Sequence, residues 1–298
     1  MQVRVVSPWF GELETDSAFL SVHILAVNAD ALLCEWAPSD ELFSFPRSKA
    51  WYCCEPWCQF RGLGGGSWPS IRARLAPHEF LFHNHADERY RVPHITHYDR
   101  AAVNLNSARQ PKAVAVVSNY GGAPRLRHPD MSYRNRFITH SSVDLYGRDG
   151  WKGYRPRVLS RRRAPSNYRG ELSGDWPAAG KRELLARYKV AVCLENMNEP
   201  NYFTEKFVEA VCAGCVPVYR ADDSVSRGVL EGAFWVDPRE HGDDPDATLH
   251  AALSVNWEAV AHQNARWLMH NPHLAASRNT SVFHRIAQLL GDDAAGHQ

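Results

Sequence analysis

The sequence predicts an α/β protein of two domains, the second of which contains a parallel sheet. Its 298 residues, 44% of them hydrophobic, are enough for two cores of ordinary size. From Lys112 onward, two segments each read as a buried strand, a helix and another strand. This is the pattern of a βαβ unit, which joins parallel strands.

The first third of the chain alternates apparent strands with turn-rich stretches. Strands are expected at residues 3–6, 19–27, 50–54 and 79–82, from hydrophobic patterning and flanking turn residues. The RGLGGGSWPS stretch that follows the third of them reads as a loop. We expect residues 1–106 to form the first domain.

The first βαβ unit begins at Lys112, where KAVAVVSNY reads as a buried strand. A helix is expected to start near Asp130, and VDLYG, at 143–147, reads as the next strand.

The second βαβ unit starts with YKVAVCL at 188–194. A helix over Thr204–Ala213 follows, stopped by Gly214, and VPVYR at 216–220 reads as the next strand. Residues 107–270 are therefore expected to form the second domain.

Two further segments complete the second half. The arginine-rich stretch at 155–180 contains many loop-forming residues and is expected to be a mobile, solvated connection. Residues 257–290 have a helical pattern, and 271–298 are expected to form a C-terminal helix and tail.

Composition restricts the class of partner. Lys and Arg number 34 against 33 Asp and Glu, so no net field attracts nucleic acid or an anionic membrane. No apolar run is long enough to span a bilayer, and the N-terminus lacks the apolar core of a signal peptide, which favours a cytoplasmic location. The seven cysteines lack the spacing of a disulfide framework and are expected to be reduced.

Two loops, at 118–134 and 195–206, are expected beyond the carboxyl ends of the parallel strands, where ligands of open α/β sheets bind. Arg134 and Lys206 each lie near the start of a helix, where a cation opposes the helix dipole. A bound anion would remove this conflict, so one interpretation is that the two residues bind a diphosphate. The alternative is that both are surface cations exposed to solvent.

The segment YKVAVCLENMNEPNYFTEKFVEAVCAGCVPV resembles the donor-binding signature of the α1,3/α1,4-fucosyltransferases, which typically read YKF, a FEN-like triplet, Tyr, TEK, a helix and AGAVPV. Upstream, AVAVVSN, the arginine-bearing helix and VDLYGR resemble that family's VVSN, Arg helix and VDVFGR at nearly the same separations. The resemblance spans roughly residues 50–240. Leu194 replaces the usual Phe, and Cys215 stands where Ala is common.

This resemblance implies the GT-B fold, in which two Rossmann-like domains face a central cleft. It also implies an inverting transfer of L-fucose from GDP-fucose to a glycan hydroxyl, without an essential metal ion. Arg134 and Lys206 would bind the diphosphate, Tyr202, Glu205 and Asn196 would line the fucose and ribose pocket, and Glu195 would support them. Glu205 would also be favourable simply as an acid in a first helical turn.

An inverting transfer needs a carboxylate that deprotonates the acceptor hydroxyl. In AWYCCEPW, Glu55 directly follows a strand, and it resembles the family's strand followed by Glu and a nearby Pro, where that Glu is the proposed base. A surface Glu at the end of a strand is the alternative reading.

Three other patterns have competing interpretations. His83, His85, His94 and His97 could ligate a metal, but no carboxylate or Cys completes a known ligand spacing. The C-x-x-C of Cys212 and Cys215 has no second pair, which favours packing over zinc or redox chemistry. GLGGG, at 62–66, is a weak dinucleotide match and fits a loop better.

Two other functions remain open at the level of sequence. The chain could be a GT-B transferase for another nucleotide sugar, or a non-catalytic nucleotide-sugar binder. The sequence does not identify the acceptor, which could be lipopolysaccharide, a free oligosaccharide or a glycoprotein glycan.

Overall fold

The computed structural model describes residues 3–6, 31–35, 40–53, 74–82, 85, 87–92, 103–105, 108–117, 129–147, 151, 164–172, 179–276, 285–286 and 288–290. The chain divides into two compact units. The first joins Met1–Ile95 to His273–Gln298, and the second is Thr96–Pro272. The sequence-based boundaries were placed after residues 106 and 270. Residues 103–105 group with the second unit because the Asn104 N–H donates to the Cys212 carbonyl at 2.9 Å.

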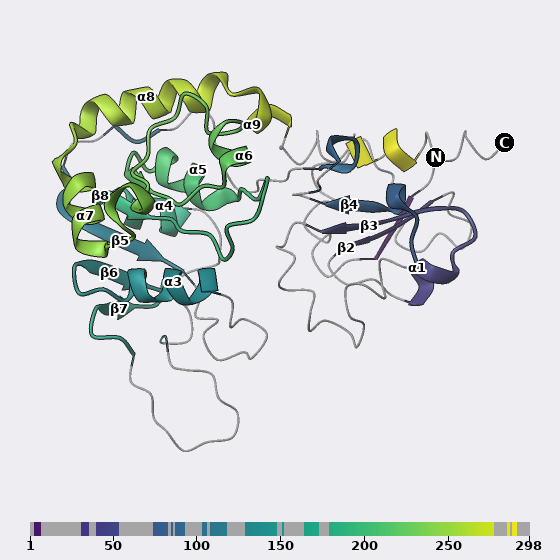
Figure 1. Ribbon diagram of the computed structural model, residues 1–298, viewed down its shortest axis with the longest axis horizontal. Helices are drawn as coiled ribbons and strands as arrows, with labels where there is room; N and C mark the ends of the chain where they lie inside the picture. Colours follow the sequence, from purple (N-terminus) through teal and green to yellow (C-terminus); the bar gives the residue numbers. More distant parts are fainter. Residues whose placement is uncertain are drawn as a thin grey trace, which may run out of the picture. The chain divides into compact units, whose positions relative to one another are not determined.

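The sheet of the first unit consists of four parallel strands in the order β1-β2-β3-β4 (Figure 1). Their bounds are Val3–Val6 (β1), Ala31–Glu35 (β2), Ser48–Cys53 (β3) and Phe80–Phe82 (β4). The short helical elements of this unit are α1 (Asp40–Ser44), η3 (Pro77–Glu79) and η4 (Glu88–Tyr90).

The core of the first unit explains why the C-terminal segment groups with it. Leu33 of β2 and Tyr52 of β3 belong to the same buried cluster as Ile286 and Leu290. Burying large apolar side chains of this kind stabilises each by roughly 1.5–3 kcal/mol.

Three of the four strands expected in the first unit are confirmed as β1, β3 and β4, with ends that differ by at most two residues. The fourth, at 19–27, lies outside the described residues. Strand β2 was missed, because Leu32, Leu33 and Cys34 are all buried and show no alternation of polar and apolar residues.

The sheet of the second unit has five parallel strands in the order β7-β6-β5-β8-β9. Their bounds are Gln110–Val116 (β5), Val143–Tyr146 (β6), Tyr168–Gly170 (β7), Tyr188–Val192 (β8) and Val216–Val218 (β9). Both βαβ units predicted from the sequence are therefore confirmed.

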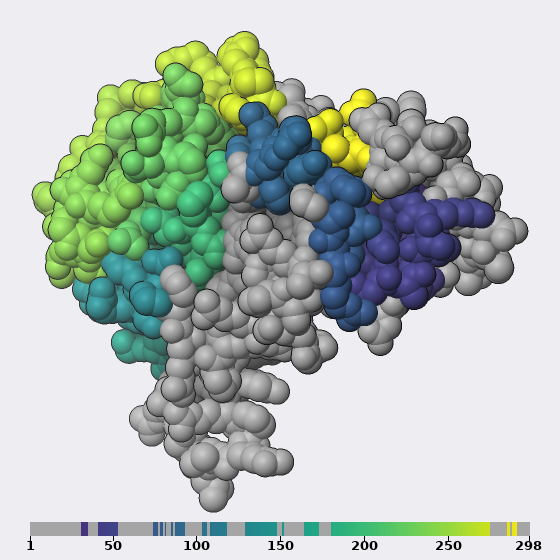
Figure 2. Space-filling model, turned by 45° about the vertical axis from the view of Figure 1, so that its right-hand side comes forward, coloured from purple at the N-terminus to yellow at the C-terminus, as the bar shows by residue number. Residues whose placement is uncertain are grey.

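Three described helices of this unit lie between its strands (Figure 1), namely Pro129–Ile138 (α3), Ala179–Leu185 (α4) and Glu205–Cys212 (α5). After β9 come Asp223–Ser226 (α6), Pro238–His241 (η7), Pro245–Ser254 (α7) and Trp257–His270 (α8). The short helix α9 (Pro272–Ala276) starts at the last residue of this unit and continues into the first unit. In the space-filling view, α7 and α8 form much of the visible outer surface of the second unit (Figure 2). None of the helices in the described part of the chain is long and apolar enough to cross a membrane.

The strand order reverses between β5 and β8. The chain moves from β5 through α3 to β6 in one direction, and from β8 through α5 to β9 in the other. Right-handed crossovers then place α3 and α5 on opposite faces of the sheet, which leaves a crevice at the carboxyl ends of β5 and β8.

The core of the second unit lies around this sheet. It includes Ala115 of β5, Phe137 of α3, Val190 of β8 and Trp257 at the start of α8. The Trp257 indole N–H donates to the Gly214 carbonyl at 2.6 Å, so its one polar atom is satisfied although the ring is buried.

The structure corrects the interpretation as a mobile connection for residues 164–172 and 179–180, the part of the 155–180 segment that it describes. Strand β7 lies within this segment, and α4 begins at its end. The Asn167 side-chain amide donates to the carbonyls of Ile138 and Val143, each at 2.8 Å, and so fixes the segment to the end of α3 and the start of β6. A three-residue edge strand is too short to produce a periodic signal, and its hydrogen bonds are with distant residues.

The helical pattern at 257–290 is interrupted in the structure. α8 ends at His270, and α9 starts at Pro272. Proline restricts the residue before it to extended conformations, which ends the longer helix.

Candidate functional site

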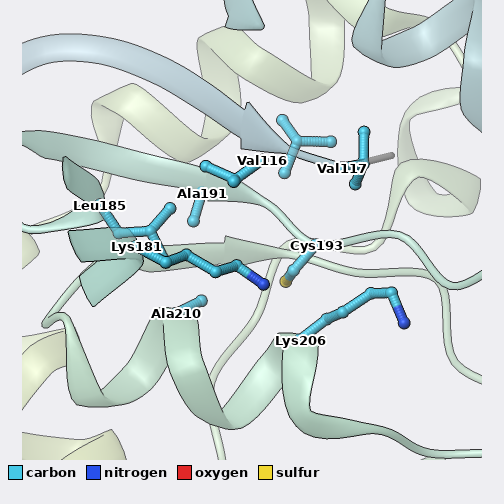
Figure 3. A pocket seen from close by; sticks show the side chains of 9 residues that line it. Val116, Val117, Lys181, Leu185, Ala191, Cys193, Lys206 and Ala210 are labelled. Carbon is cyan, nitrogen blue, oxygen red and sulfur yellow. The ribbon is translucent and has the colours of Figure 1, made fainter. Parts of the chain in front are cut away.

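A small pocket lies at the topological switch point of the second unit. It is lined by residues at the carboxyl ends of β5 and β8 and by residues of α4 and α5, namely Val116, Val117, Lys181, Leu185, Ala191, Val192, Cys193, Lys206 and Ala210. Figure 3 shows the ammonium groups of Lys181 and Lys206 on the two sides of the Cys193 side chain. The pocket therefore joins apolar strand ends to two cations.

The start of α5 positions Lys206 and is encoded locally. Thr204 has extended backbone geometry and is the N-cap, and Gly214 takes the left-handed φ of +75° just after the helix. The predicted helix over Thr204–Ala213 is thereby confirmed with both of its end signals. Lys206 is placed in the first turn, where its ammonium donates to the Thr204 hydroxyl oxygen at 2.9 Å.

Glu195 holds this region together. Its Oε1 accepts from the Thr204 N–H at 2.9 Å, the Thr204 hydroxyl at 2.7 Å and the Tyr219 hydroxyl at 3.1 Å. Its Oε2 accepts from the Lys206 ammonium at 2.9 Å. Glu195 is only 5% exposed, so four donors compensate a carboxylate that would otherwise be costly to bury.

The charges around α5 fix the protonation states of its first turn. Burial disfavours the Lys206 ammonium, but the carboxylates of Glu195 and Glu205 outweigh burial and raise its pKa above the ordinary value. Burial opposes ionisation of Glu205 too, yet the cations of Lys206 and Lys181 lower its pKa to about 2. Near neutral pH, Lys206 is a cation and Glu205 an anion.

Arg134 reaches the same place from α3. Its side chain is 1% exposed, and its guanidinium donates to the side-chain oxygen of Asn196. Asn196 is next in sequence to Glu195, which accepts from the Lys206 ammonium at 2.9 Å. The two cations that the sequence singled out, from helices on opposite faces of the sheet, are therefore neighbours.

A second pocket adjoins Arg134. It is lined by residues of α3, the β8–α5 loop and the end of β9, namely Asp130, Tyr133, Arg134, Leu194, Glu195, Met197, Asn198 and Arg220. Six of these eight residues have polar or charged side chains.

The remaining residues singled out in the β8–α5 segment differ in their placement. Asn196 is buried against Arg134, and the Glu205 carboxylate is 32% exposed and lies 3.6 Å from the Lys206 ammonium. Tyr202 is 4% exposed, and its N–H donates to the Glu199 carbonyl at 3.1 Å. Asn196, Tyr202 and Glu205 line neither of the two pockets described above.

Sequence reasoning missed Lys181, Asp130 and Arg220, which line these pockets. Lys181 forms a buried ion pair with Glu209 of α5. Arg220 lies two residues after the end of β9. A charged residue beyond the carboxyl end of a third strand was a signal available in the sequence.

Glu55, the predicted base, lies outside the described residues, as do His83, His94 and His97. Among the histidines of that cluster, the structure describes His85, whose Nδ1 accepts from the Asp87 N–H at 2.9 Å. Within the described part of the chain, no three His, Cys, Asp or Glu residues gather in a way that could hold a metal ion.

The two cysteines of the C-x-x-C pattern are buried and are not joined in a disulfide, as the packing interpretation predicted. The Cys215 thiol donates to the Leu185 carbonyl at 3.2 Å, and burial raises its pKa to about 12. A thiol of this kind is inert near neutral pH.

Known proteins resemble this chain in part of its sequence and in its fold. No protein-family model matches the chain. A fucosyltransferase-like protein of Arabidopsis thaliana is 32% identical over 93 residues, which are 31% of this chain and 18% of that relative's length. The chain thus matches only a small part of that protein.

Solved structures show the fold. A crystal structure of α1,3-fucosyltransferase matches 98% of this chain and 90% of its own, with a TM-score of 0.51 and 14% identity. A structure of α1,3-fucosyltransferase with GDP gives the same TM-score, at 15% identity over 98% of this chain and 91% of its own. The predicted α/β fold with two Rossmann-like domains, of the GT-B kind, is confirmed, and so is the resemblance to fucosyltransferases.

Proposed function

We propose that this chain is a glycosyltransferase of the α1,3/α1,4-fucosyltransferase family. It transfers L-fucose from GDP-fucose to a glycan hydroxyl, with inversion and in an α1,3-type linkage. The observation that carries this proposal is that Arg134 and Lys206 hydrogen-bond to the adjacent residues Asn196 and Glu195, just beyond β8 at the switch point of a Rossmann-like sheet. One of the solved fucosyltransferase structures with the same fold contains GDP.

The site chemistry suits a nucleoside diphosphate. Arg134 supplies a planar, permanently charged guanidinium, and Lys206 supplies a compact ammonium at a helix N-terminus. Together they would stabilise the negative charge that develops on the departing GDP, and stabilisation of this kind often makes the largest contribution to an enzyme's rate. In this proposal no metal ion is essential, because the two cations neutralise the diphosphate.

The other groups have complementary roles. Glu205 and Asn196 would contact the sugar and ribose hydroxyls, with Tyr202 beside them. Glu195 would hold Lys206 in place. Glu55 would be the base that deprotonates the acceptor, a contribution of about 10² to 10⁴ in rate.

Calorimetric titration with GDP, GDP-fucose and guanosine tests the donor site. Arg134→Ala should lower the affinity for GDP and for GDP-fucose about 10- to 100-fold, because a charge-assisted hydrogen bond contributes roughly 1.5–3 kcal/mol. The affinity for guanosine, which has no phosphate, should be unchanged. Lys112→Ala is the matched control, since its ammonium is paired with Asp144 at 2.6 Å in the same sheet and lines neither pocket. Unchanged GDP affinity in Arg134→Ala would refute the diphosphate site.

Two measurements separate the alternatives. Tighter binding of UDP or ADP sugars than of GDP-fucose would favour another GT-B transferase. Binding of GDP-fucose without turnover on an array of glycan acceptors would favour a non-catalytic binder.

A further inference from the structure

The β8–α5 loop, residues 195–204, is held against α3 by the carboxylate of Asp130. Asp130 Oδ2 accepts from the Asn198 N–H at 2.9 Å. Two residues earlier in the loop, Asn196 accepts from Arg134. Asp130 and Arg134 are four residues apart on α3 and therefore share one face of the helix. Helix α3 thus contacts the loop through two side chains of the same face.

Arg220, just after β9, supports Asp130 from the other side. Its guanidinium lies 3.4 Å from Asp130 Oδ1 and 3.5 Å from Asp243 Oδ2, and its Cζ lies 4.9 Å from the centre of the Tyr133 ring. The Arg220 side chain is 24% exposed, so these ion pairs are partly shielded from solvent. Asp130 is thereby confined between the loop and the end of β9.

The start of the β8–α5 loop connects these contacts to the two candidate donor cations, Arg134 and Lys206. At its start, Glu195 accepts from the Lys206 ammonium, and Asn196 accepts from Arg134. A shift of the loop relative to α3 would therefore change the separation of Arg134 and Lys206. Binding of a diphosphate by two cations depends on that separation, because each must reach its own phosphate oxygens.

We propose that Asp130 is a positioning residue, supported by Arg220, which fixes the β8–α5 loop against α3 and so sets the separation of Arg134 and Lys206. The choice of GDP as the bound anion rests on the proposed function. The anchoring of the loop by Asp130 does not depend on any ligand and can be tested on the protein alone.

The experiment has one readout for each statement. Hydrogen–deuterium exchange measures protection of the loop amides without any ligand, and calorimetry measures GDP affinity. Asp130→Ala should raise the exchange rate of the Asn198 amide at least about 10-fold and lower the affinity for GDP about 10-fold. Arg220→Gln should produce a smaller change in the same direction in both readouts.

Asp144→Asn is the matched control. Asp144 pairs with Lys112 and Arg169, each at 2.6 Å, on the same sheet but away from the loop. It should lower the melting temperature while leaving loop exchange and GDP affinity at wild-type values. An equal loss of GDP affinity in Asp144→Asn and Asp130→Ala would overturn the positioning role in favour of a general loss of stability.

The remaining outcomes separate the two statements. Unchanged loop exchange in Asp130→Ala overturns the anchor, and faster exchange with unchanged GDP affinity overturns the positioning role. Absence of GDP binding by the wild-type protein refutes the proposed function, and the exchange measurement still decides whether Asp130 anchors the loop.

Discussion

Replacing Lys206 should cost both stability and GDP affinity, and a second substitution should restore only the first. Lys206 donates to a Glu195 carboxylate whose side chain is 2% exposed. In Lys206→Met this carboxylate stays buried without its counter-charge. Loss of one partner from a buried ion pair typically costs about 3–5 kcal/mol.

We expect Lys206→Met to lose about 3 kcal/mol of stability, the lower end of that range. Glu195 keeps the Thr204 N–H, the Thr204 hydroxyl and the Tyr219 hydroxyl as donors. A loss of about 3 kcal/mol lowers the melting temperature by about 6–12 °C in a domain of 150–250 residues.

The double variant Glu195→Gln/Lys206→Met removes the buried charge but keeps a side-chain oxygen that can accept from Thr204 and Tyr219. Its stability should return to within about 1 kcal/mol of wild type, because neutral replacement of a buried pair is often close to neutral in free energy. Its GDP affinity should stay about 10- to 100-fold weaker, since the cation is still absent.

Thermal unfolding measures the first quantity and calorimetric titration with GDP the second. A double variant no more stable than Lys206→Met would refute the idea that the unpaired Glu195 charge causes the loss. Recovery of GDP affinity in the double variant would show that Lys206 makes no contact with the phosphates.

Three further predictions use other parts of the chain. Glu55→Gln should retain GDP binding but lower kcat by about 10²-fold or more, because an amide cannot take the acceptor proton; activity within a few fold of wild type would place the base elsewhere. Single-turnover fucosyl transfer should survive exhaustive chelation, whereas a drop to background that zinc or manganese restores would favour a metal site at the histidine cluster. Gly214→Ala should destabilise by about 3 kcal/mol, since its Cβ would lie 2.0 Å from the Asn104 carbonyl oxygen in a left-handed conformation; Gly232→Ala, with φ +83° and open space, should cost only about 1–2 kcal/mol, and equal losses in the two variants would contradict the close contact.

Local signals in the sequence determined much of the second unit. Thr204 and Gly214 mark the ends of α5 because an N-cap side chain and a left-handed glycine act within one or two residues of their own position. The buried strands β5 and β8 were recognisable as continuous apolar runs. The same reasoning singled out Arg134 and Lys206 as cations near helix starts, but only Lys206 lies in a first helical turn. Arg134 is the sixth of the ten residues of α3, so the helix dipole gives no account of it.

The partners of these cations required the tertiary structure. Arg134 and Asn196 are 62 residues apart in sequence, and Arg220 and Asp130 are 90 apart. Strand β7 was likewise invisible, because Asn167 fixes it through hydrogen bonds to residues more than 20 positions away. The order of strands in the sheet brings such residues together. That order is set by burial of the whole hydrophobic core, whereas hydrophobic periodicity and capping residues report only on a chain's nearest neighbours in sequence.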